Sequence, residues 1–239
     1  MSSIYEQIAN LPPEKRKLFE KMLMEQGVDL SQIMIVPQKR DGKPFPLSYS
    51  QQRLWFLDQL EPGSALYNIP SVLRIRGKLN IEALQKSFND IIRRHEVLRT
   101  TFSTVDENPV QIIADTLELE IPVIRVEESD RQRREETIHE MALEEALQPF
   151  NLHTGPLLRV KLLKISNEEH ILLVTMHHIV SDNWSTGLFV HEMLQLYPAF
   201  AAGKPSPLPD PPVQYADFAH WQRKWLSGKT LENQLSYWR

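Results

Sequence analysis

Three residues in one short stretch carry the groups most suited to acid–base chemistry: His177, His178 and Asp182. The run before them, residues 171–175, is apolar and β-branched, which predicts a buried strand. Apolar residues after Asp182 recur at helical spacing, so a helix is expected to follow. Because successive side chains of a strand point to opposite faces, only one of the two histidines can face a given cleft. The other is expected to pack into the sheet or its covering layer.

This stretch allows two interpretations. In the first, two hydrogen-bonded histidines and a helix-capping aspartate have only structural roles. In the second, one histidine is a general base, supported by its neighbour and by an aspartate that braces the loop. A metal site is disfavoured, because adjacent strand histidines diverge. These residues alone leave the first two interpretations open.

Arg94 and Arg99 form a second group of interest, near the end of a helix that Asn80 is expected to cap. Arginines at such a position are usually solvated or interact with the helix dipole. Arg99, however, lies between Leu98 and Phe102, and a buried arginine requires a partner. The sequence therefore predicts a buried carboxylate near Arg99. Asp182 is one candidate.

Helical and strand patterns alternate along the chain, which predicts an α/β sandwich. A short amphipathic helix over 12–26 and a proline-containing connector precede this region. The expected elements are a helix over 48–60, a strand over 67–79, a helix from 80, strands over 110–113 and 119–126, a helix over 131–147, a hairpin of 157–165 and 171–176, a helix ended by 201–203, an extended crossing over 205–212, and a helix from 215 toward 239.

Composition narrows the class of protein. The chain has 239 residues, of which 41% are hydrophobic and 24% charged, as is ordinary for a globular protein. A net charge of −4 without a basic run disfavours a nucleic-acid partner. The lack of cysteine excludes disulfides and a cysteine nucleophile, and suits a reducing cytoplasm. No secretory or membrane-spanning pattern is found, so a soluble, cytoplasmic protein is expected.

Four blocks of the sequence, in order, resemble the first four core motifs of the condensation domains of nonribosomal peptide synthetases. They are residues 48–57, 94–102, 176–185 and 215–223, and the third has the form His-His-x-x-x-Asp. Residues 149–159 resemble a further stretch of that family. The resemblance covers about residues 45–239, and leaves 1–44 as an N-terminal helix and linker that could dock a partner.

The resemblance implies a chloramphenicol-acetyltransferase-like two-layer sandwich, here the N-terminal lobe of a two-lobed domain. It implies a transferase that forms an amide bond between a donor acyl or peptidyl thioester and an acceptor aminoacyl thioester. Both thioesters would be carried on the phosphopantetheine arms of carrier proteins, with no cofactor or metal bound by this chain itself. Carrier proteins, adjacent synthetase domains and a C-terminal lobe would be its partners.

The same resemblance assigns roles to individual residues. His178 would be the catalytic residue, with His177 and Arg94 in support, and Asp182 would pair with Arg99 to hold the loop. The segment 183–185, Asn183, Trp184 and Ser185, would contact substrate.

Two departures from the family pattern matter. Asn183 stands where the family usually has glycine. If the position needs positive φ, asparagine is the best-tolerated substitute, but its side chain could narrow the route of the acceptor or reduce activity. The family's second lobe and later motifs are not in the sequence, whose final helix has no stop signal. The chain is therefore expected to be truncated and inactive alone. Two alternatives remain: a non-catalytic docking or structural lobe, and a hydroxyl-acylating acyltransferase of the same superfamily.

Overall fold

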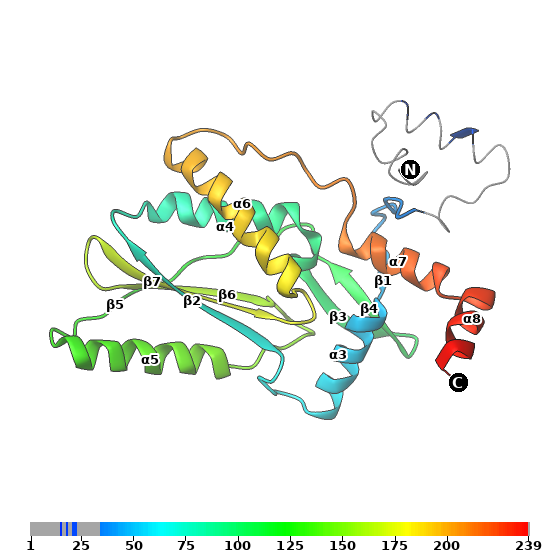
Figure 1. The fold of residues 1–239 in the computed structure, drawn as a ribbon, viewed down its shortest axis with the longest axis horizontal. Helices are drawn as coiled ribbons and strands as arrows, with labels where there is room; N and C mark the ends of the chain where they lie inside the picture. The colour runs from blue at the N-terminus through cyan, green and yellow to red at the C-terminus, as the bar shows by residue number, and fades with distance from the viewer. Residues whose placement is uncertain (1–14, 16–17, 19–20, 23–33, 239) are drawn as a thin grey trace.

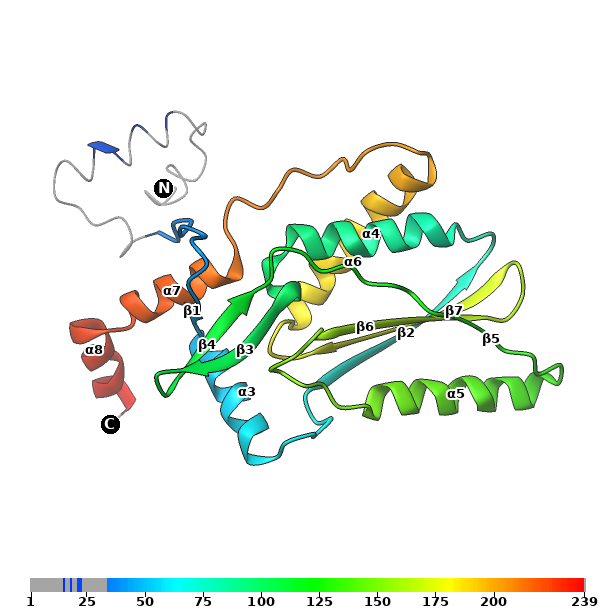
Figure 2. The same ribbon diagram turned by 180° about the vertical axis from the view of Figure 1, so that it is seen from behind.

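The fold is described from a computed structural model, which covers residues 34–238 and the isolated residues 15, 18, 21 and 22. The expected helix at 12–26 lies almost wholly outside the described residues and stays a prediction. Figures 1 and 2 show two layers of helices around a central sheet, with a smaller sheet at one end.

The central sheet has four strands in the order β2-β7-β6-β5. Strand β7 (Glu169–His177) pairs antiparallel with β2 (Asn68–Arg76) and with β6 (Leu158–Lys164). The short β5 (Val123–Arg125) joins β6 in parallel. The hairpin of β6 and β7 was predicted from the sequence and is confirmed. Because β7 lies inside the sheet and is buried on both faces, it reads as a nearly continuous apolar run.

Two helices, α4 (Ile81–Arg94) and α6 (Asn183–Ala201), pack against each other on one face of this sheet, and α5 (Arg131–Leu147) covers the other (Figures 1 and 2). The alternation along β7 supplies both cores: Leu172, Val174 and Met176 belong to the core that also holds the buried residues of α4 and α6, whereas Ile171 and Leu173 belong to the core under α5. The alternation of side chains along β7 therefore decides which of its residues face α6 and which face α5.

The smaller sheet, in the order β1-β4-β3, consists of β1 (Phe45–Pro46), β4 (Asn108–Ile113) and β3 (Thr100–Val105). A 3₁₀ turn, η2 (Glu96–Arg99), connects α4 to β3. Helix α3 (Tyr49–Leu60) begins with the expected capping box, in which Ser48 and Gln51 satisfy each other's backbone N–H groups. Helix α7 (Tyr215–Trp225) contacts β1 and η2, so residues far apart in sequence meet at this end of the sandwich.

The structure corrects three sequence predictions. Strand β3 was not predicted, although its β-branched residues Thr100, Thr101, Thr104 and Val105 favour a strand. Only residues 123–125 of the expected strand over 119–126 pair with a neighbour. The helix expected from 215 toward 239 is two helices, α7 and α8 (Gly228–Trp238), because the chain turns after Trp225 and Gly228 adopts a φ of +50°.

The last residues of the expected linker are attached to the sandwich. The side chain of Arg40 donates to Asp217 of α7 at 2.7 Å and to Glu96 of η2 at 2.7 Å. The backbone N–H of Gln38 donates to the same Asp217 carboxylate at 2.9 Å. The boundary at residue 45 stays a prediction, but Gln38 and Arg40, which precede it, have partners in the sandwich. Across the part of the chain that the structure describes, no helix is both long and apolar enough to span a bilayer.

Candidate active site

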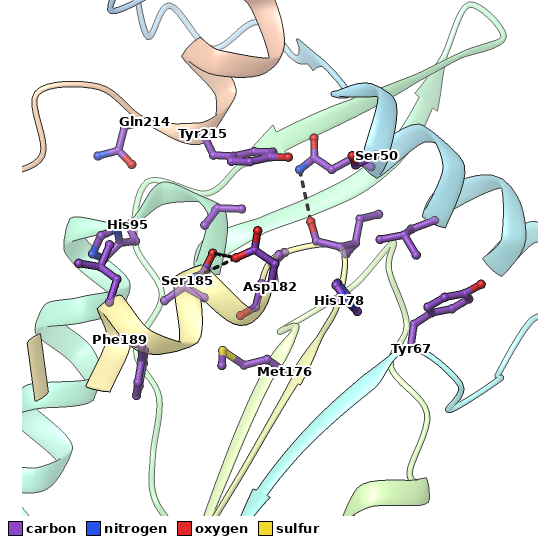
Figure 3. A pocket seen from close by; sticks show the side chains of 18 of the residues that line it. Ser50, Tyr67, His95, Met176, His178, Asp182, Ser185, Phe189, Gln214 and Tyr215 are labelled. Carbon is purple, nitrogen blue, oxygen red and sulfur yellow. Dashed lines mark hydrogen bonds between the residues drawn. The ribbon is translucent and has the colours of Figure 1, made fainter. Parts of the chain in front are cut away.

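A cavity of about 520 Å³ opens where β7 ends and α6 begins (Figure 3). Residues from α3, the start of β2, α4, η2, α6 and the segment before α7 surround it. More apolar than polar surface lines it, and its polar side chains come from several elements, including the His178–Asp182 turn. Its lining includes the side chains of Tyr67, His95, Met176, His178, Asp182, Ser185, Phe189 and Tyr215.

The two histidines lie on opposite sides, as their adjacency predicted. Met176 belongs to the α4–α6 core and lines the cavity, and the next residue, His177, is 3% exposed and turned away from it. His178 follows the last residue of β7 and lines the cavity with an exposed side chain. Of these two histidines, His178 is therefore the one that a bound substrate can reach.

His177 is held inside the protein. Its Nδ1 atom accepts a hydrogen bond from the backbone N–H of Ile179 at 3.1 Å. Its ring lies edge-on to Phe150, with centroids 6.0 Å apart, and 6.4 Å from the ring of Tyr67. Burial, together with the nearby His178, lowers the pKa of His177 to about 4. At neutral pH it is an uncharged acceptor that shapes the turn, so its Nδ1 lone pair is not free to take a proton from substrate.

Asp182 is the N-cap of α6, as one interpretation of the sequence expected. Its Oδ1 atom accepts from the Ser185 backbone N–H at 2.7 Å and from the Ser185 hydroxyl at 2.6 Å. These hydrogen bonds lower the pKa of Asp182, and attraction to His178 lowers it further. Figure 3 shows the carboxylate between His178 and Ser185. An ionised aspartate thus stands beside the open histidine.

The predicted pairing of Asp182 with Arg99 is wrong in this structure. Arg99 instead donates to three backbone carbonyl groups, those of Ala114 at 2.8 Å, Ile92 at 3.1 Å and Arg93 at 2.9 Å. The last carbonyls of a helix lack intrahelical partners, and the guanidinium satisfies two of them at the end of α4. Asp182 is occupied by its own helix. Arg99 therefore fastens α4 to the end of β4 and does not reach the turn.

A buried arginine–carboxylate pair does form, but its arginine is Arg94 and its carboxylate is Glu192. Its guanidinium donates to Glu192 of α6 at 2.9 and 3.3 Å and to the carbonyls of Leu208 and Pro209 at 3.2 and 2.5 Å. The ring of His95 lies 2.9 Å from the same carboxylate. Burial alone would raise the pKa of Glu192, but the hydrogen bonds from Arg94 and His95 outweigh it and lower that pKa. This cluster joins α4, α6 and the extended crossing behind the cavity.

Sequence reasoning missed several residues of the site. Glu192 could have been found as a lone acid facing inward on an apolar helix. Tyr215 lay inside a recognised motif without a role; its hydroxyl is 3.0 Å from the Ser48 hydroxyl, and burial raises its pKa. Tyr67 lines the cavity, and its backbone carbonyl accepts a hydrogen bond from the His178 backbone N–H at 2.8 Å. No pattern along the sequence pointed to it.

The three residues expected to contact substrate differ in position. Ser185 lines the cavity, whereas Asn183 and Trp184 are exposed and lie outside its lining. Asn183 does not have the positive φ that would favour glycine, because it is the first residue of α6. The condition of a positive φ at this position is therefore not met. Within the residues that the structure describes, no group of three His, Asp or Glu side chains could hold a metal ion.

The fold is that of the condensation-type domains. Solved domains of this class have the same chloramphenicol-acetyltransferase-like sandwich that was expected from the sequence. The X-domain in the complex of the X-domain and OxyB from teicoplanin biosynthesis is 28% identical, with a TM-score of 0.77 over 86% of this chain and 44% of its own. The starter condensation domain of the rhizomide synthetase RzmA shares the fold, with a TM-score of 0.71, 23% identity, and coverage of 82% of this chain and 47% of that one.

The family follows from the sequence match: the Condensation domain family matches residues 43–239, and the chain belongs to it. A linear gramicidin synthase of Brevibacillus parabrevis is 47% identical over 95% of this chain and 3% of its own length. Phosphinothricin tripeptide synthetase PhsC of Streptomyces viridochromogenes is 39% identical over the whole chain and 22% of its own length. The chain thus spans a small part of these curated relatives and less than half of the two solved domains.

Proposed function

We propose that this chain is the histidine-bearing lobe of a domain that joins two carrier-bound thioesters through an amide bond. The acceptor amine attacks the donor thioester carbonyl, the C–S bond breaks, and the thiol of the donor arm leaves. One observation carries the proposal: of two adjacent histidines, the structure buries His177 as a neutral acceptor and exposes His178 in the cavity.

The chemistry asks little basicity of His178. An α-amino group has a pKa of about 7.7 to 8, so roughly a tenth of it is neutral near pH 7. His178 would orient that amine, or take its proton as the tetrahedral intermediate forms, a step that typically contributes about 10²–10⁴-fold. Asp182, whose pKa is lowered by its hydrogen bonds to Ser185 and by His178, is ionised beside it. The apolar walls, with Met176 and Phe189, would exclude water from the thioester.

Both thioesters would reach the cavity on phosphopantetheine arms, and the carrier proteins would be partners of the complete protein. Proximity catalysis requires both reacting groups in near-attack geometry. Since the chain covers 44% and 47% of the two solved domains it resembles, it supplies one wall of such a cleft. We place the reaction in the cytoplasm, in keeping with the cysteine-free sequence.

The test compares the 239-residue chain with the same chain joined to the second lobe of a relative. Two loaded carrier proteins are mixed with each, and the product on the acceptor carrier is followed by mass spectrometry. The chain alone is expected to form no amide bond, and the two-lobed protein to form it. His178→Ala should then reduce the rate about 10²–10⁴-fold. His139→Ala, on the distant helix α5, is the matched control and should leave the rate unchanged.

A second candidate, a docking lobe without catalysis, is favoured by the similarity to the teicoplanin X-domain, which was solved in a complex with OxyB. Full amide-bond formation by the His178→Ala two-lobed protein would refute the catalytic assignment. Absence of product from the unmodified two-lobed protein, with both carriers loaded and the protein folded, would favour the docking lobe.

A further inference from the structure

A chain of buried amides leads from the smaller sheet to the turn that carries His178. Gln51 of α3 and Gln111 of β4 are each 1% exposed, and the Gln51 Nε2 atom donates to Gln111 Oε1 at 3.1 Å. The Gln111 Nε2 atom donates in turn to the Pro46 carbonyl at 2.9 Å. On the other side, Gln51 Nε2 donates to the carbonyl of Ile179 at 3.5 Å, the bond drawn at the cavity in Figure 3.

The turn itself has few other attachments to distant elements. The backbone N–H of His178 donates to Tyr67, that of Ile179 to the ring of His177, and that of Val180 to the carbonyl of His177. Two of these three bonds lie within the turn. Gln51 supplies the contact from α3, a long hydrogen bond to the carbonyl of the residue directly after His178.

The orientation of Gln51 is fixed by its neighbours. Its Oε1 atom accepts from the backbone N–H of Ser48 at 3.0 Å, so its Nε2 group must face Gln111 and Ile179. A carboxylate there would turn an oxygen toward two acceptors, and a hydrocarbon would leave buried polar atoms unpaired. The position therefore needs an amide, both for its donor and for its acceptor.

We infer that Gln51, held by Gln111, is a positioning residue that fixes the His178 turn against the cavity. This role rests on the proposed function only for its effect on rate; the effect on the turn can be measured in this chain without any reaction. In this role Gln51 acts through the backbone carbonyl of Ile179.

The experiment measures amide hydrogen exchange of His178 and Ile179 by NMR in the 239-residue chain, for Gln51→Leu, Gln51→Glu and a control. The control is Asn89→Leu, which also removes an amide that clamps a backbone, at Leu119, away from the cavity. At the turn, exchange in Gln51→Leu is expected to be faster than in Asn89→Leu, by up to about tenfold, since a net hydrogen bond is worth up to about 1.5 kcal/mol. Unchanged exchange at the turn overturns the inference.

Gln51→Glu guards against a simple failure to fold, because it keeps the shape and the acceptor for Ser48. Burial raises the pKa of such a carboxyl group, and the protonated form can donate again. Compared with the unmodified chain at the same pH, the turn of Gln51→Glu should therefore exchange faster at about pH 8 and at nearly the same rate at about pH 5.5. A turn that stays unprotected at both values, or protected at both, overturns the donor role.

In the two-lobed protein, Gln51→Leu should lower kcat about tenfold with KM unchanged, because the turn that carries His178 is less well held. Full activity of His178→Ala would refute the proposed function instead, and the exchange data would still decide the role of Gln51.

Discussion

Replacing Glu192 tests which carboxylate braces this lobe. The Glu192 carboxylate pairs with the Arg94 guanidinium, and each of the two residues is 5% exposed. Removing one partner of a buried ion pair typically costs about 3–5 kcal/mol, because the other charge stays buried. Arg94 keeps the carbonyls of Leu208 and Pro209, so Glu192→Leu should cost about 3 kcal/mol, near the lower end of that range. Asp182→Ala removes an exposed helix cap and should cost about 1 kcal/mol.

The assay is denaturant unfolding of each variant, read as the change in midpoint at constant slope. Glu192→Gln is the graded control, since it keeps an acceptor for Arg94 but loses the charge, and it should fall between Glu192→Leu and the unmodified chain. Because the pKa of Glu192 is lowered from 4.5, its contribution is present above that pH and is lost as the pH falls through the lowered pKa. If Asp182→Ala proved as costly as Glu192→Leu, the brace would have been assigned to the wrong residue.

Three further predictions follow from single contacts. The pKa of His177 is about 4 in the folded chain and about 6.5 unfolded, so stability should fall by roughly 3 kcal/mol as the pH is lowered from 6.5 to 4, and His177→Gln should lack that fall in pH-dependent melting. Asn183→Gly should cost at most about 1 kcal/mol in denaturant unfolding of the chain and leave the amide-forming rate of the two-lobed protein unchanged, because Asn183 begins a helix outside the cavity lining. Arg40→Ala should lower the melting temperature, although Arg40 precedes the family match, since it bridges Glu96 to the buried Asp217; an unchanged melting temperature would mean that this segment is only loosely held.

Local patterns predicted the elements that position the site. The apolar run before His177 predicted the strand β7, and the caps at Ser48, Asn80 and Asp182 each start a helix in the structure. The opposite orientation of His177 and His178 followed from strand geometry alone. These inferences succeeded because each depends on interactions within a few residues along the chain.

Partners across the fold were not predictable in the same way. Arg94 and Arg99 lie close together near the end of one helix, so either could be expected in a buried ion pair on local grounds. The decision depends on which arginine faces α6 once α4 has packed against it. Arg94 is among the residues of α4 buried in that packing, and Arg99 lies beyond the helix, where free carbonyls are at hand.

The position of the brace changes how the site is held. A pair between Asp182 and Arg99 would have fixed the turn directly, but α6 would have lost its cap. In the structure, Asp182 keeps the cap and stays ionised next to His178, while Glu192 and Arg94 anchor α6 further along the helix. The carboxylate next to His178 is therefore separate from the carboxylate that holds the helix. Changes at Asp182 should act mainly on the chemistry of His178, and changes at Glu192 mainly on the stability of the lobe.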